Sequence, residues 1–159
     1  RNRMRRKDRE ITDGRRIDEI ILSCDCLRLG MTDGCEAYIV PLNFGFTHEA
    51  EKRSFYMHCA PEGRKIDLLR KNSRVGFELD TGHAVNAGEI ACGYSFRFQS
   101  VIGTGTVSFV AEPKDKEAAL RQIMRHYAGE ADWGFDSRAL DAVTILRMDV
   151  ETLACKAHE

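Results

Sequence analysis

The order of apolar and polar positions along the chain predicts a protein that is built mainly from β-strands. Apolar residues alternate with polar ones, or form short runs, in six segments separated by turn-forming residues. Thr32-Asp33-Gly34 separates the first two segments, and Asp-Gly between apolar runs is typical of a hairpin because glycine accepts a positive φ. The six predicted strands lie in residues 26–46, which hold the hairpin, and in residues 53–60, 74–80, 96–111 and 139–153.

Three further segments show helical spacing. Residues 12–25 place Ile17, Ile20 and Ile21 on one side after Thr12 or Asp13 as a candidate N-cap, residues 63–72 form a short helix, and a longer helix runs from Pro113 to Gly129. Residues 81–95 are polar and glycine-bearing and predict a loop, and Gly103 and Gly105 predict a bend in the long strand. Short connections between strands predict an antiparallel six-stranded sheet curled into a small barrel with flanking helices.

Composition limits the chain to one domain and narrows its partners. With 159 residues and 43% hydrophobic content, the chain supports one core, so we predict a single domain over residues 1–159 with a basic lead-in at residues 1–11. Charged residues make up 31% but nearly cancel at a net charge of −1, which predicts no nucleic-acid partner and no membrane partner. The sequence contains neither an apolar run of membrane length nor a secretory signal, so we expect a cytoplasmic protein.

The cysteines and histidines do not predict a metal site. The six cysteines contain no CxxC pair, and we expect reduced thiols that are buried or half-buried. The histidines lack a metal-binding spacing such as HExxH. The segment GTGTVS has two glycines of a dinucleotide fingerprint, but it lies inside a predicted strand and no helix follows it.

Two cations stand at the start of the short helix over residues 63–72. Arg64 and Lys65 face the positive end of the helix dipole, which is unfavourable unless a negative group is present. A phosphate would resolve this conflict, because the helix start offers N–H donors and Gly63 allows close approach of the backbone. The simpler alternative is that both side chains extend into water, with Glu62 or Asp67 as local partners.

The strand before this helix separates its side chains by face. Phe55, Met57 and Cys59 share one face and His58 the other, so Cys59 and His58 do not form a nucleophile–base pair. A lone strand histidine is more often a packing or surface residue, but His58 lies beside the proposed phosphate loop and is the best candidate for proton transfer. Pro41 interrupts another strand and predicts an edge, where it either blocks aggregation or borders a flat heterocycle together with Asn43.

Four segments together resemble one family. AYIVPLNFGF, FYMHCAPEGRKIDLLRKNSRVGFELD, FQSVIGTGTV and ILRMDVETLACK follow one another in the order and at the spacing of the pyridoxamine 5′-phosphate oxidase-related flavin-binding proteins. The branch that is most similar contains the 5-nitroimidazole resistance proteins. The resemblance covers about Met4 to Lys156 and implies a split β-barrel that forms a homodimer with FMN at the subunit interface.

The resemblance also implies which residues bind FMN. Arg64 and Lys65 match the pair that holds the phosphate, and Trp133, the sole tryptophan, matches either a cap on the pocket from the partner subunit or an apolar anchor of the dimer. Three further groups match strands that border the cofactor, the last of them from the partner subunit: Val40, Pro41, Leu42 and Asn43; His58, Cys59 and Ala60; and Gln99, Ser100 and Val101.

What the resemblance implies about activity is an FMN-dependent oxidoreductase that passes electrons to a small organic acceptor, with a nitroaromatic as one candidate. His58 is the predicted catalytic residue. Pyridoxamine phosphate is not the expected substrate, because the family's Arg-x-His segment is absent from the sequence. Two alternatives stay open: a flavin-binding sensor or storage module without turnover, and a haem-binding barrel with a histidine as axial ligand.

Overall fold

The computed structural model describes residues 4–159, so residues 1–3 of the predicted basic lead-in lie outside the described residues. The rest of the lead-in is ordered against the sheet. A 3₁₀ turn, η1 (Lys7–Arg9), precedes the short strand β1 (Glu10–Ile11). Strand β1 pairs with the end of the last strand, where Ile11 stands opposite Cys155.

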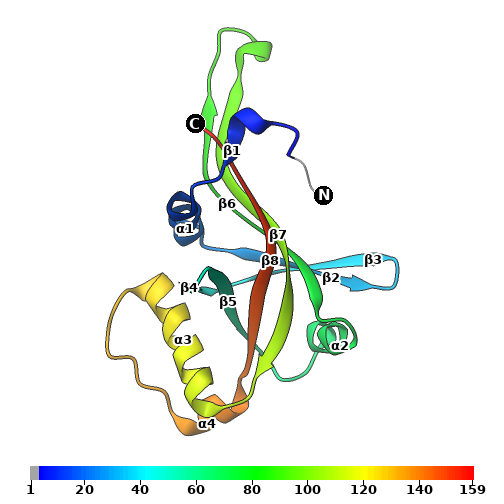
Figure 1. Ribbon diagram of the computed structural model, residues 1–159, viewed down its shortest axis with the longest axis vertical. Helices are drawn as coiled ribbons and strands as arrows, with labels where there is room; N and C mark the ends of the chain where they lie inside the picture. The colour runs from blue at the N-terminus through cyan, green and yellow to red at the C-terminus, as the bar shows by residue number, and fades with distance from the viewer. Residues whose placement is uncertain (1–3) are drawn as a thin grey trace.

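Eight antiparallel strands form one strongly curved sheet (Figure 1), so the predicted count of six strands is wrong. Its main path runs in the order β3-β2-β6-β7-β8-β5-β4. The strands are β2 (Leu27–Asp33), β3 (Glu36–Leu42), β4 (Gly45–Glu49), β5 (Lys52–Cys59), β6 (Arg74–Asn86), β7 (Ser95–Val110) and β8 (Thr144–His158).

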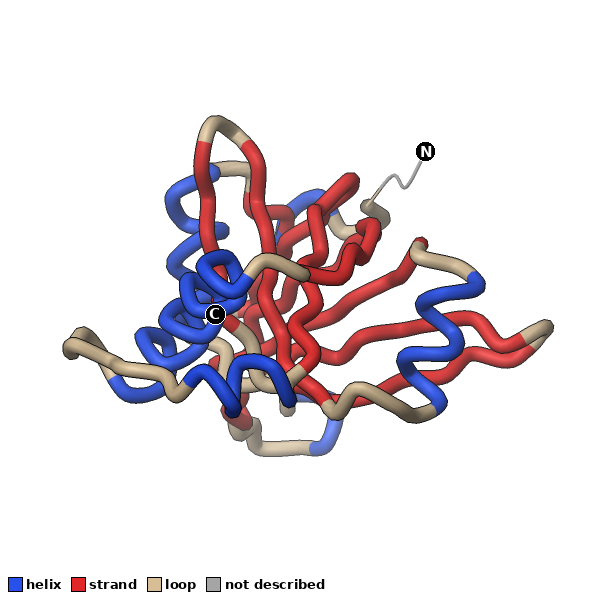
Figure 2. Tube along the Cα trace, turned by 90° about the horizontal axis from the view of Figure 1, so that it is seen from below, coloured by secondary structure: helices blue, strands red, loops and turns tan. Residues whose placement is uncertain are grey.

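Four α-helices lie around the outside of the curled strands (Figure 2). They are α1 (Gly14–Leu22), α2 (Arg64–Lys71), α3 (Pro113–Ala128) and α4 (Ser137–Ala142). The predicted start of the first helix and the predicted end of the third are confirmed. The Asp13 carboxylate caps α1 by accepting from the backbone N–H of Arg16, and Gly129 ends α3 with a φ of 81°. Both caps satisfy helix-end groups that would otherwise lack partners.

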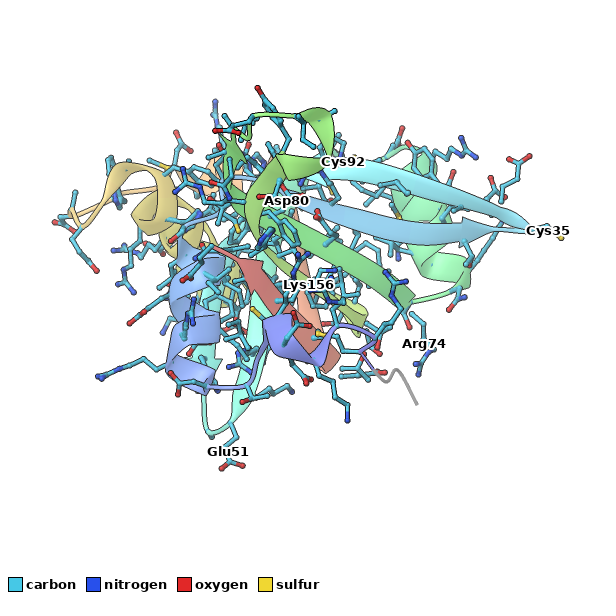
Figure 3. All side chains as sticks on the ribbon, turned by 90° about the horizontal axis from the view of Figure 1, so that it is seen from above. Cys35, Glu51, Arg74, Asp80, Cys92 and Lys156 are labelled. Atoms are coloured by element: carbon cyan, nitrogen blue, oxygen red, sulfur yellow. The ribbon has the colours of Figure 1, made fainter. Side chains whose placement is uncertain are left out.

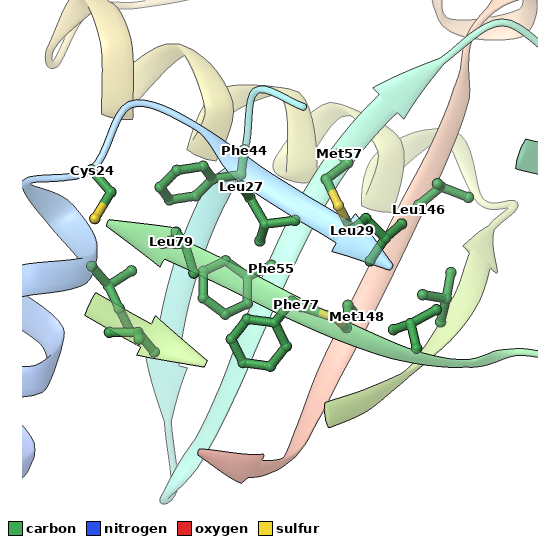
Figure 4. Close-up of a cluster of buried hydrophobic side chains, with 14 of the residues drawn as sticks. Cys24, Leu27, Leu29, Phe44, Phe55, Met57, Phe77, Leu79, Leu146 and Met148 are labelled. Atoms are coloured by element: carbon green, nitrogen blue, oxygen red, sulfur yellow. The ribbon is translucent and has the colours of Figure 1, made fainter. Parts of the chain in front are cut away.

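The barrel interior is an apolar cluster with an aromatic centre. Strand β2 crosses over β5, and Leu27, Leu29, Met57, Leu79, Leu146 and Met148 fill the space between them together with Phe44, Phe55 and Phe77 (Figure 4). The ring centroids of Phe55 and Phe77 lie 5.4 Å apart, within the range of favourable aromatic contact. This is the mainly antiparallel split β-barrel that the sequence predicts.

Three local predictions were wrong. The predicted second strand is divided, because Phe44 turns into the core and its N–H donates to the Tyr127 hydroxyl instead of continuing the ladder. The predicted loop at residues 81–95 is strand over its first part: β6 continues to Asn86 through an irregularity between Thr81 and Ala84, and residues 87–94, with the turn η2 (Ala91–Gly93), connect it to β7. Residues 139–142 belong to α4 rather than to a strand, because the Asp136 carboxylate caps the preceding turn.

The sheet has a face that none of the helices α1 to α4 of the described residues covers. Two neighbouring rows of paired residues run across β3, β2, β6 and β7 on this face. The first row is Ile39, Gly30, Gly76 and Thr104, and the second is Pro41, Arg28, Glu78 and Ile102. We call this the outer face. Ile39 and Ile102 are 63% and 51% exposed on it.

Candidate functional site

The first turn of α2 carries both cations beyond a glycine, as predicted. Gly63 occupies the N-cap position with a φ of 138°, a conformation that favours glycine, and no side chain caps the helix. The free N–H groups at this helix start are therefore available to a ligand.

Arg64 bonds to the β2–β3 hairpin rather than extending into water. Its Nη2 donates to Oδ2 of Asp33 at 2.8 Å, and its guanidinium lies 4.2 Å from the centre of the Tyr38 ring. The alternative that named Glu62 or Asp67 as its partner was wrong for Arg64. The ion pair is half exposed, at 51% for Arg64 and 45% for Asp33, so a competing anion can reach the guanidinium.

Lys65 faces a different space, an open hollow of about 580 Å³. Besides Lys65, the hollow is lined by the end of β5 and by α4, through His58, Cys59, Ala60, Pro61, Ala139, Ala142 and Val143. Burial raises the pKa of the Cys59 thiol, and the nearby Lys65 ammonium opposes that rise. The hollow thus joins one cation to a mainly apolar wall.

The two faces of β5 divide as predicted. Phe55 and Met57 are fully buried in the core, and Cys59 is half-buried against it, whereas His58 is exposed. Because His58 and Cys59 point to opposite sides of the strand, a direct proton transfer between them is excluded. His58 is one of the residues that line the hollow beside Lys65.

Strand β3 is an edge strand, which confirms the prediction from Pro41. Val40 and Leu42 pack half-buried against the core, while Pro41 and Asn43 are exposed. None of the four lines the hollow beside Lys65. The contact of Arg64 with Tyr38 nevertheless brings β3 next to the start of α2.

The predicted β7 residues lie far from this hollow within one chain. Val101 is fully buried, so only its backbone could contact a ligand. Ser100 lies on the outer face, where it stands opposite Asp80 on one side and Lys156 on the other; Figure 3 labels both of these partners. Gln99 lines a separate hollow of about 220 Å³. By register the Lys65 hollow is at the other end of the sheet, because His58 stands opposite Ile145, which stands opposite Val110.

Trp133 lies in the loop between α3 and α4, outside the lining of the Lys65 hollow. Its indole N–H donates to the carbonyl oxygen of Gly129. Sequence reasoning missed the α4 wall because residues 139–143 read as strand. Asp136 was the signal that could have revealed it, since aspartate is a strong N-cap.

A polar cluster interrupts the outer face. Nη1 of Arg28 lies 3.0 Å from Oε1 of Glu78 and 3.3 Å from Oδ2 of Asp80, and Nε2 of His83 lies 3.0 Å from Oδ1 of Asp80. Burial, together with the adjacent Asp80 carboxylate, raises the pKa of Glu78 to about 7. The pKa of Asp80 is lowered by a hydrogen bond from Glu78 and by Arg28.

Two further hollows, of about 400 and 460 Å³, lie beside β1 and beneath α3, and neither contains Arg64 or Lys65. Within the described residues, no three His, Cys, Asp or Glu side chains are placed to hold a metal ion, and no helix is long and apolar enough to cross a membrane. All six cysteines are free, and the exposure of Cys35 and Cys92 corrects the prediction that every thiol is at least half-buried.

Comparison with known proteins decides the family. The model of the pyridoxamine 5′-phosphate oxidase family matches residues 13–157. The chain belongs to this family. This family assignment confirms the resemblance that the four sequence segments carry. A search of curated protein sequences found no match to the chain.

Solved structures agree with this assignment. A protein from Bacteroides thetaiotaomicron, named for 5-nitroimidazole antibiotic resistance, is 33% identical over 94% of this chain and 90% of that chain, with a TM-score of 0.80. Flavocytochrome Anf3 from Azotobacter vinelandii is 15% identical, covering 99% of this chain and 72% of that chain, with a TM-score of 0.81. A FAD and haem binding protein from Mycobacterium smegmatis is also 15% identical, over 95% and 74% of the two chains, with a TM-score of 0.79. The last two similarities show the fold alone.

Proposed function

We propose that this chain is an FMN-dependent oxidoreductase that works as a homodimer and passes electrons to a small organic acceptor, with nitroaromatic compounds as the first class to test. The observation that carries the proposal is the pair of cations at the uncapped start of α2, next to a hollow with an apolar wall. A flavin mononucleotide needs both features, because its phosphate is anionic and its flat ring system has an apolar dimethylbenzene part.

The residues present fit such a cofactor. Lys65 and the N–H groups after Gly63 would hold the phosphate by charge-assisted hydrogen bonds, and Arg64 would join them once its guanidinium leaves Asp33. Small side chains of α4, Ala139 and Ala142, leave space beside the strand end that bears His58. The fit needs no rearrangement of the core, since every one of these groups lies on the surface of the barrel or at a helix end.

Bound FMN supplies the electron transfer, and the chain holds and orients it. The apolar wall of the hollow would keep water from one side of a bound ring. His58 is exposed toward the hollow, so an imidazole nitrogen can give a proton to the acceptor or take one from the donor. The Cys59 thiol stays protonated because burial raises its pKa.

A second copy would complete the site. Gln99 and Ser100, which the family resemblance assigns to the cofactor, lie at the opposite end of the sheet from Lys65 in one chain. The outer face exposes Ile39 and Ile102 on a glycine-bearing surface that no helix within residues 4–159 covers. A two-fold arrangement through this face would bury both isoleucines and bring β7 of one copy to α2 of the other.

An absorbance spectrum provides the first test. The purified protein, or the protein after addition of FMN, should show the two visible bands of an oxidised flavin, and dithionite should bleach them. Protein that stays colourless and does not quench FMN fluorescence would refute the proposal. Oxidation of a reduced nicotinamide with a nitroaromatic acceptor then separates an enzyme from a sensor or storage module.

Removing the cations provides the site test. The double variant Arg64→Ala, Lys65→Ala should weaken FMN binding at least tenfold, because each charge-assisted contact contributes about 1.5–3 kcal/mol. Riboflavin lacks the phosphate, so its affinity should not change. Lys71→Ala removes a cation from the other end of α2 and is the matched control. Equal FMN affinity in the double variant and in the control would contradict the phosphate assignment.

The haem alternative is separable by the same measurements. The two structures named for haem binding share only the fold with this chain, at 15% identity. A Soret band that forms on addition of haem and is lost in His58→Ala would favour haem over flavin.

A further inference from the structure

Strands β6 and β7 extend beyond the barrel as a two-stranded arm. The last pair that joins β7 to β8 is Phe98 with His158, and beyond it β6 and β7 pair only with each other. We call residues 82–97 the arm. Figure 1 shows it projecting away from the helices, and Cys92 marks its far end in Figure 3.

The two faces of the arm differ in polarity. Val85 stands directly opposite Phe96, and the His83 ring stacks on Phe96 at 5.9 Å between centroids with an angle of 17°. On the other face, Asn86 donates to the Ser95 hydroxyl at 3.1 Å. The arm is therefore an amphipathic hairpin, because successive strand residues point to opposite faces.

The apolar face of the arm has no partner within the described chain. Val85 is 61% exposed and Phe96 47%, and at the tip Ile90 and Tyr94 are 69% and 54% exposed. A two-stranded hairpin is at best marginally stable in water, and it becomes stable when its apolar face packs against something. Clustered exposed apolar side chains of this kind mark interaction surfaces.

We infer that the apolar face of the arm packs against a second copy of this chain, at the end of the barrel where the partner holds its flavin. The inference rests on the proposed homodimer. Its ground is continuity: Phe96, Ser100 and Ile102 are spaced by even numbers along β7, so the apolar face of the arm continues the outer face through which the two copies would join.

The position of the hollow agrees with this placement. The arm extends from the start of β7. The hollow lies at the level of the end of β7, because Val110 pairs with Ile145, which in turn pairs with His58 in the lining of the hollow. A two-fold axis through the outer face that reverses the strand direction brings the start of β7 in one copy to the end of β7 in the other. The arm of one copy thus reaches the flavin hollow of its partner and closes a side that its own chain leaves open.

Polar substitution on the apolar face tests the inference. Val85→Ser combined with Phe96→Ser should raise the dissociation constant of the dimer at least tenfold, measured by sedimentation equilibrium, because aromatic anchors dominate interfaces. It should also weaken FMN binding. Both side chains are largely exposed within one chain, so the variant should keep the far-ultraviolet circular dichroism of the wild type. Asn86→Ala with Ser95→Ala changes the polar face of the arm and is the control, expected within twofold of wild type.

Each outcome has a defined meaning. The inference is overturned if the double variant Val85→Ser, Phe96→Ser has the same dimer dissociation constant as the wild type. It is also overturned if the wild-type protein stays monomeric. A monomer that instead binds phosphatidylcholine vesicles through the arm would assign the surface to a lipid partner and also overturn it. If no flavin binds but the double variant still weakens the dimer, the arm contact stands and the proposed function fails.

Discussion

Asp33→Asn tests whether the β2–β3 hairpin competes with the cofactor for Arg64. Without a ligand, Nη2 of Arg64 donates to the Asp33 carboxylate at 2.8 Å, and both groups are about half exposed. Exposed ion pairs of this kind contribute about 0.2–1 kcal/mol. A phosphate that takes this donor must displace the carboxylate, so the variant should bind FMN about 1.5-fold to 5-fold more tightly.

The assay is a titration of flavin fluorescence with FMN and, separately, with riboflavin. Riboflavin has no phosphate, so its affinity should be equal in the wild type and in Asp33→Asn. The gain for FMN should shrink as NaCl is added, because salt screens exposed charges. Weaker FMN binding in the variant would refute competition and would show instead that Asp33 positions Arg64 for the phosphate. An equal change for both ligands would indicate a structural effect of the hairpin.

Two further predictions concern stability. The pKa of Glu78 is raised from its usual 4.5 to about 7. The contribution of its protonated form to the free energy of unfolding is therefore fully present below pH 4.5 and is lost as the pH rises through 7. Between pH 5 and pH 8, the free energy of unfolding of Glu78→Gln, measured with urea, should therefore rise by about 1–2 kcal/mol relative to that of the wild type. This figure is reduced for solvent screening, because the Glu78 side chain is 33% exposed. A gap between the two proteins that is independent of pH would contradict this. Gly103→Ala should lower the free energy of unfolding by about 1–3 kcal/mol, because its Cβ would lie 2.6 Å from the Phe77 ring and would clash with the Thr152 carbonyl oxygen. Gly134→Ala, with nothing within 4 Å of its Cβ, is the control, and equal losses in both variants would exclude the steric explanation.

Local pattern was sufficient wherever one feature dominated a segment. The spacing of Ile17, Ile20 and Ile21 predicted α1, and all three side chains are buried. Asp33-Gly34 predicted the β2–β3 turn, where Gly34 has a φ of 60°. Pro41 predicted an edge strand. In each case the physical cause acts within a few residues, so it is readable from the chain alone.

Long-range pairing decided the elements that the pattern missed. Residues 81–86 are polar, yet they form strand because the long β7 offers a ladder that satisfies their backbone groups. Residues 139–142 were predicted as the start of the last strand, yet the Asp136 cap and packing near α3 make them part of helix α4. Local propensity loses to such tertiary contacts because each contact satisfies or buries groups that the segment alone leaves in water.

By itself, the sequence determined the fold class, the family and the two cations at the start of α2, because these depend on residue type and order. Tertiary structure alone decided that Arg64 bonds to Asp33 whereas Lys65 faces the hollow with α4, and that Gln99 and Ser100 lie at the opposite end of the sheet. The reason is that side-chain partners and strand register are set by segments far apart in the chain, which meet only when the sheet curls around its core.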